Sequence, residues 1–166
     1  METPLQYKAR ILALMEGKDP VAVQADTYRQ IAGLVQGVPQ EKLRARPGAD
    51  RWSVAEILAH LAEAEVVSTW RYRQMIEHNG GPLPGYAQDL WASLGQYAAR
   101  DPRESLESFR LLREANLRMF DRLTPEEWQR NGIHAERGPM TVRDLATQIA
   151  GHDLNHTAQL KAIVAA

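Results

Sequence analysis

Cysteine is absent from the 166 residues of the chain. Disulfide bonds, thiolate metal ligands and a catalytic cysteine of the protein's own are therefore excluded. Long apolar runs are absent too, because no stretch approaches the roughly 18 consecutive apolar residues of a membrane-spanning helix. The first residues, METPLQYKAR, lack the apolar centre of a secretory signal. We therefore expect a cytoplasmic protein that makes no use of a membrane.

The chain also lacks an excess of charge of either sign, with 20 Lys and Arg against 21 Asp and Glu. Such a balance argues against a dedicated surface for nucleic acids or anionic membranes. Hydrophobic residues make up 44% of the sequence, which at this length is enough for one buried core. We expect a single domain over residues 1–166.

Apolar residues recur every three or four positions in four long segments, which is the spacing of one face of an α-helix. Capping residues, prolines and glycines set the limits of these segments. They run over about 19–36, 53–78, 101–120 and 141 to near the C-terminus. We also expect short helices at 5–15 and 124–128 and a short amphipathic piece within 79–100. No alternating run predicts a strand, so the expected fold is all-α, a four-helix bundle. The connection over 79–100 is long enough to be a crossover.

Three of the five histidines lie at inward positions of these helices. His152 and His156 are four residues apart, so they project from the same face of the fourth helix, where the pattern calls for apolar side chains. His60 lies at the edge of the apolar stripe of the second helix. A buried imidazole needs a partner to offset its desolvation, and a divalent metal shared by all three rings would supply one. Ordinary hydrogen bonds in the core are the alternative. The spacing HDLNH lacks the glutamate of the HExxH zinc proteases, which argues against that class.

Two sequence blocks resemble the DinB-like superfamily. The first is WSVAEILAHL, residues 52–61, and the second combines GPMTVRDL, residues 138–145, with GHDLNH, residues 151–156. The resemblance implies a four-helix bundle that holds a divalent metal, zinc or nickel, through three histidines. These match His60, His152 and His156 one by one. It also implies a homodimer.

Three further polar residues are candidates for catalysis. Glu63 lies one turn after His60, where it could orient that ring or act as a base. Gln148 and Asn155 lie one turn to either side of His152 and could bond to the ligand rings or to substrate, although ordinary polarity at a helix flank explains them equally well. Glu56 is accounted for as the capping partner of Ser53.

The two remaining histidines are expected to lie outside the site. We interpret His78 as a cation that favours the C-terminal end of the second long helix. We expect His134 to be a solvent-exposed loop residue.

Three imidazole ligands would leave a metal at least one open position, which is typical of catalytic rather than structural sites. Two reactions follow: hydrolysis of a small molecule by metal-bound hydroxide, or activation of an external low-molecular-weight thiol as its thiolate. The superfamily includes enzymes that use bacillithiol or mycothiol and proteins described as metal-dependent hydrolases. We favour S-transferase-like chemistry on a small electrophile. The alternatives are a metal-dependent hydrolase and a non-enzymatic bundle that binds a metal or a small ligand.

Overall fold

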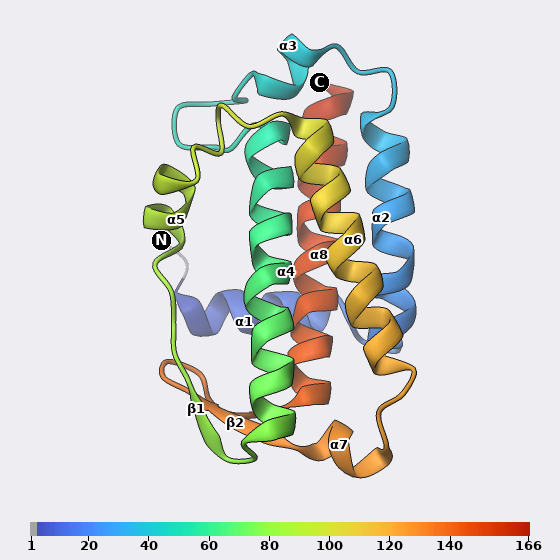
Figure 1. Ribbon diagram of the computed structural model, residues 1–166. Helices are drawn as coiled ribbons and strands as arrows, with labels where there is room; N and C mark the ends of the chain where they lie inside the picture. The colour runs from blue at the N-terminus through green and yellow to red at the C-terminus, as the bar shows by residue number, and fades with distance from the viewer. Residues whose placement is uncertain (1–2) are drawn as a thin grey trace.

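The computed structural model describes residues 3–166, whose four long helices form a bundle (Figure 1). The helices are α2 (Pro20–Val35), α4 (Val54–Glu77), α6 (Pro102–Phe120) and α8 (Val142–Ala165). Helix α2 packs against α6 and α8, and α4 packs against the same two. The predicted all-α four-helix bundle is confirmed, and the predicted helix limits lie close to the observed ones.

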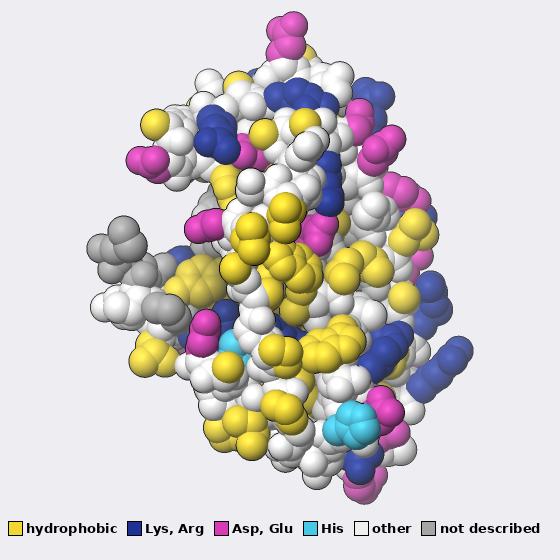
Figure 2. All heavy atoms as spheres, turned by 60° about the vertical axis from the view of Figure 1, so that its left-hand side comes forward, with side chains coloured by type: hydrophobic (Ala, Val, Ile, Leu, Met, Phe, Trp, Pro, Cys, Tyr) yellow, Lys and Arg dark blue, Asp and Glu magenta, His cyan; other side chains and the backbone are white. Residues whose placement is uncertain are grey.

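The order of helix directions is not a simple up-and-down alternation. In Figure 1, α2 and α8 run upward, whereas α4 and α6 both run downward. The connection between α4 and α6 must therefore return along the whole bundle, as the predicted crossover does. It contains β1 (Gly81–Leu83) and α5 (Gln88–Leu94). On the side of the bundle where α5 lies, several large hydrophobic side chains are exposed at the surface (Figure 2). Those of α4 and α5 are Val66, Trp70, Leu90 and Leu94.

Short helices close the ends and one side of the bundle. They are α1 (Pro4–Ala13), α3 (Gln40–Arg44) and α7 (Pro125–Gln129). Helix α1 lies across the bundle and packs on α8 (Figure 1). Helix α3 was not expected from the sequence. No helix within residues 3–166 has both the length and the apolar character that a membrane crossing requires.

A three-stranded sheet lies at the end of the bundle where α4 ends and α8 begins. Strand β2 (Asn131–His134) pairs in parallel with β1 and antiparallel with β3 (Gly138–Thr141). The sequence predicts no strand here, because these segments are three or four residues long and contain glycine or proline. The sheet also corrects the expectation for His134, which is only 3% exposed. Pairing of β2 with both neighbours encloses this side chain.

The core consists of two apolar clusters with a polar layer between them. One cluster includes Ile31, Leu58, Leu61, Phe109 and Leu160, and the other includes Tyr72, Met75, Phe120, Met140 and Leu145. Along α4, α6 and α8 the residues between the clusters are buried but polar: Glu65, Arg113, Asn116 and Asp153. The polar layer lies at the same level of α8 as His152 and His156.

Close contact between α1 and α8 depends on Gly151, because a β-carbon there would lie 2.2 Å from the backbone oxygen of Ile11. We expect Gly151→Ala to destabilise the fold by about 1–3 kcal/mol, since neither backbone can yield without moving α1. Urea unfolding followed by circular dichroism measures this change. Gly33→Ala on α2 is the matched control, because a β-carbon at Gly33 meets no atom within 4 Å.

The control substitution is expected to stabilise by about 0.5–1 kcal/mol, since alanine is the better helix former. Equal stabilisation by both substitutions would contradict the tight packing of α1 on α8.

Candidate metal centre

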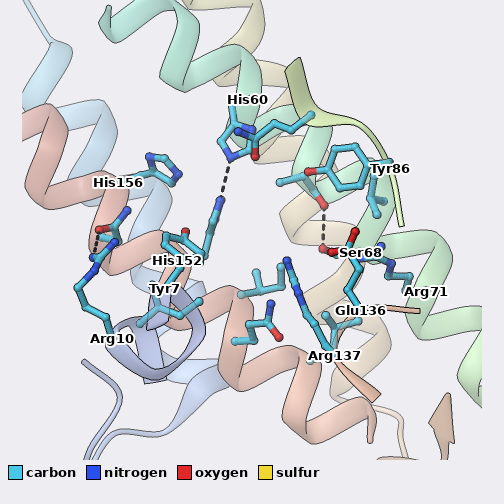
Figure 3. A pocket seen from close by; sticks show the side chains of 18 of the residues that line it. Tyr7, Arg10, His60, Ser68, Arg71, Tyr86, Glu136, Arg137, His152 and His156 are labelled. Carbon is cyan, nitrogen blue, oxygen red and sulfur yellow. Dashed lines mark hydrogen bonds between the residues drawn. The ribbon is translucent and has the colours of Figure 1, made fainter. Parts of the chain in front are cut away.

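His60 of α4 faces His152 and His156 of α8 inside the bundle (Figure 3). The Nε2 atoms of His60 and His152 are 2.9 Å apart. One nitrogen from each of the three rings lies within 4.8 Å of the other two. The antiparallel packing of α4 against α8 thus brings the three predicted ligands together.

Burial keeps the imidazoles of His60 and His156 neutral. It lowers the pKa of His60 well below the ordinary value, and the nearby His152 and His156 lower it further. Burial also lowers the pKa of His156, to about 3, and His152 adds to the shift. The neutral imidazole, with a free lone pair, is the form that binds a metal.

The donor set fits a divalent metal. Nδ1 of His156 lies 2.8 Å from Oε1 of Gln159, a contact that leaves Nε2 of the ring available as a ligand. Tetrahedral zinc with nitrogens at 2.0–2.1 Å needs them about 3.3 Å apart, close to the separation of His60 from His152. Nδ1 of His152 lies 4.0 Å from the Asp153 carboxylate, which is the kind of group that orients a ligand ring.

A pocket of about 470 Å³ opens beside the three rings (Figure 3). Both predicted polar residues of α8 line it. Gln148 is 5% exposed, and its Oε1 has no hydrogen-bond partner in the described part of the chain. The side-chain oxygen of Asn155 accepts a hydrogen bond of 2.7 Å from Arg10 of α1. The oxygen of Gln148 is therefore available to orient groups in the pocket, whereas that of Asn155 is engaged by Arg10.

Glu63 is not among the described residues that line this pocket. Its carboxylate accepts a hydrogen bond of 2.7 Å from Arg100, near the end of the crossover. The contacts of Glu63 therefore do not favour the predicted role of base or of ring-orienting group. Glu56 completes the predicted capping box with Ser53 and pairs in addition with Arg46.

Three arginines that the sequence did not indicate also line the pocket, Arg10, Arg71 and Arg137. They come from α1, α4 and the turn between β2 and β3, so local patterns do not connect them. The position of Arg71 beside the pocket could, however, have been predicted from its spacing to His60. It lies eleven residues after His60, about three helical turns, and therefore on the same face of α4.

Comparison with known proteins identifies the family. The model of the DinB superfamily matches residues 25–160. The chain belongs to the DinB superfamily. A protein of Oceanobacillus iheyensis named "Putative metal-dependent hydrolase OB0413" is 24% identical over 142 residues, which cover 83% of this chain and 80% of that protein.

The solved structure of YfiT from Bacillus subtilis has the same fold as this superfamily member. It superposes with a TM-score of 0.81 at 17% identity, covering 97% of this chain and 87% of YfiT. YfiT is described as a probable metal-dependent hydrolase with an unusual four-helix bundle topology. These comparisons confirm two predictions from the sequence, the resemblance to the DinB superfamily and the four-helix bundle.

A buried ionic layer lies directly behind His152 in this DinB fold. The Arg113 guanidinium of α6 donates to Glu65 of α4 at 2.9 Å and to Asp153 of α8 at 2.6 Å. It also donates to the backbone oxygen of Gln24 in α2 at 3.0 Å. Burial raises the pKa of Asp153, but the charge of Arg113 and the nearby His152 outweigh burial and hold it below the ordinary value. Asp153 is therefore ionised beside the candidate ligand.

Removal of the Arg113 charge is expected to destabilise the fold strongly. Arg113→Met would leave two buried carboxylates without their cation, which costs about 3–5 kcal/mol. Arg110→Met, one turn earlier on α6, is the control. Arg110 pairs with Glu107 and Glu114 near the surface, so its loss should cost less than about 1 kcal/mol. Urea unfolding measures both variants, and similar losses would contradict the dominant role of the buried layer.

Burial, with the charges of Arg71 and Arg137, lowers the pKa of His134 to about 4. Between about pH 6.5 and pH 4, His134 is therefore protonated in the unfolded chain but not in the folded chain, so the stability of the fold decreases as the pH falls. In His134→Asn this contribution is lost, and the decrease in melting temperature over that range should be smaller. Asparagine retains an acceptor for the backbone N–H of Glu136. An unchanged pH dependence would show that His134 titrates normally.

Proposed function

We propose that this chain is a divalent-metal-dependent hydrolase of a small molecule, with His60, His152 and His156 as the metal ligands. The observation that carries the proposal is the meeting of three imidazoles, those of His60 and His156 buried, beside a pocket of about 470 Å³. A bound divalent metal supplies a Lewis acid that brings the pKa of water toward 7. Zinc and nickel are the expected metals, because both suit imidazole ligands. The names of the two relatives support the same class of reaction.

The remaining pocket residues would bind and orient the substrate. The unpartnered Oε1 of Gln148 is placed to accept a hydrogen bond from water or from a substrate N–H or O–H group. Asn155, held by Arg10, would position polar groups near His156. Apolar side chains cover the wall between the polar groups and exclude water there. They are Ile11, Val67, Leu145 and Ile149.

Thiol-dependent S-transfer, the reaction favoured from the sequence, is a second candidate. It is supported by the pocket of about 470 Å³ beside the three imidazoles, in which a small thiol could reach a bound metal. Because the chain has no cysteine, that thiol would have to be a cosubstrate. The homodimer implied by the resemblance stays a prediction.

Loss of any one ligand should abolish tight metal binding. We expect His60→Ala, His152→Ala and His156→Ala each to weaken binding by about 100-fold or more, since even the loss of a group that only orients a ligand costs about 10- to 100-fold. Zinc and nickel titration, with elemental analysis of the untagged protein, measures the change. His78→Ala is the control, because His78 lies exposed at the end of α4. Equal effects of His78→Ala and His152→Ala would contradict the ligand assignment.

Turnover distinguishes hydrolysis from thiol transfer. With metal-loaded protein, we expect hydrolysis of p-nitrophenyl esters that chelation or His152→Ala abolishes. An added thiol should inhibit this reaction, because it competes with water for the open position. The opposite result, turnover of an electrophile only when thiol is present, would replace hydrolysis by S-transfer.

A further inference from the structure

Arg71 is a buried cation without a carboxylate partner. It is 5% exposed, and its guanidinium donates one hydrogen bond of 2.8 Å, to the backbone oxygen of Pro84. Its Nε has no partner, and residues 3–166 place no carboxylate within ion-pair distance of it. Buried charges are ordinarily paired, as Arg113 is with two carboxylates. Arg71 therefore lacks a paired anion, and the nearby carboxylate of Glu136 acts on it only from outside ion-pair distance.

Arg137 brings a second guanidinium to the same pocket. It belongs to the turn between β2 and β3, and Figure 3 shows its side chain extending into the pocket. Within the described chain this side chain has neither a hydrogen bond nor an ion pair. Burial lowers the pKa of Arg71, and the nearby charge of Arg137 lowers it further. Arginine nonetheless stays protonated at neutral pH, so both groups are cations.

The pocket as a whole has an excess of positive charge. Arg71 and Arg137 both line it, against a single described carboxylate, that of Glu136. Glu136 is exposed and makes no ion pair with either Arg71 or Arg137 within the described residues. Its single negative charge therefore cannot balance the two positive charges of Arg71 and Arg137.

Arg71 lies on the opposite side of the pocket from His156, and the side chain of Arg137 extends between Arg71 and His152 (Figure 3). The α-carbons of His60 and Arg71 are roughly 16 Å apart along α4, and side chains on a helix lean toward its N-terminus, so Arg71 leans back toward His60. The wall between them is apolar, formed in part by Ala64 and Val67. The pocket therefore suits an elongated molecule with an anionic group at one end.

We propose that Arg71 and Arg137 form a subsite for the carboxylate or phosphate group of the substrate, whose reacting bond lies at the three histidines. The fork of a guanidinium matches the oxygens of either anion and binds them through charge-assisted hydrogen bonds. The assignment as a substrate subsite rests on the proposed function. Anion binding at the two arginines does not.

Binding of simple probes tests the subsite. We expect hexanoate or hexyl phosphate, measured by calorimetry, to bind at least tenfold more tightly than 1-hexanol, and the stronger of the two identifies the preferred anion. Arg137→Gln should weaken that binding at least tenfold. Arg71→Gln should also weaken the binding. Arg137→Gln is the better test, because the side chain of Arg137 is less buried and its substitution disturbs the fold less. Arg73→Gln is the matched control, since Arg73 is exposed on α4 outside the pocket.

The His152→Ala variant distinguishes the two ends of the pocket. Anion binding that survives His152→Ala and is lost in Arg137→Gln supports the subsite. Binding that needs His152 and is unchanged in Arg137→Gln overturns it, because the anion then sits at the histidines. Failure of both probes to bind more tightly than hexanol also overturns it.

A kinetic comparison links the subsite to the proposed reaction. The metal-loaded protein should prefer mono-p-nitrophenyl adipate over p-nitrophenyl hexanoate in kcat/KM, and Arg137→Gln should reduce this preference at least tenfold. Equal use of both esters would overturn the subsite as a substrate determinant. If neither ester is hydrolysed while Arg137-dependent anion binding persists, the proposed hydrolase function fails and the anion site stands.

Discussion

The Arg113 guanidinium contacts the three other long helices from its position on α6. Its partners are Gln24 of α2, Glu65 of α4 and Asp153 of α8. A charge so far from water is tolerated only when it is paired, so these helices must keep one register relative to each other. Asp153 directly follows His152 in the chain. The register that satisfies Arg113 therefore also decides which residue of α8 faces His60, and the candidate site depends on it.

The ends of the long helices could be predicted because their signals are local. Ser53 and Glu56 satisfy each other's backbone donors within one turn, and Asp19 caps the helix that begins at Pro20. The helical spacing of His152 and His156 likewise follows from four residues of sequence. Such contacts form wherever the helix forms, whatever the rest of the chain does.

The parts that could not be predicted depend on residues far apart in sequence. Strand β1 pairs with β2 about fifty positions later, and its glycine and proline give no alternation that would indicate a strand. His134 is buried only through that pairing, which is why a loop was expected. Glu63 looked free for catalysis because its partner, Arg100, is 37 residues away. The helical spacing along α4 indicates that Arg71 lies on the same face as His60. Only the fold shows that Arg137, from the turn between β2 and β3, reaches the same pocket.

The charges of the site are arranged on two sides of the histidines. Behind His152, the buried layer holds two carboxylates, Glu65 and Asp153, against the one guanidinium of Arg113, so it is net negative. This negative charge would offset part of the charge of a metal held by the three rings and would keep His152 oriented. The pocket in front is positive, through Arg71 and Arg137. An anionic molecule is thus attracted to the open side and repelled by the layer behind it, so electrostatics and shape favour the same direction of approach.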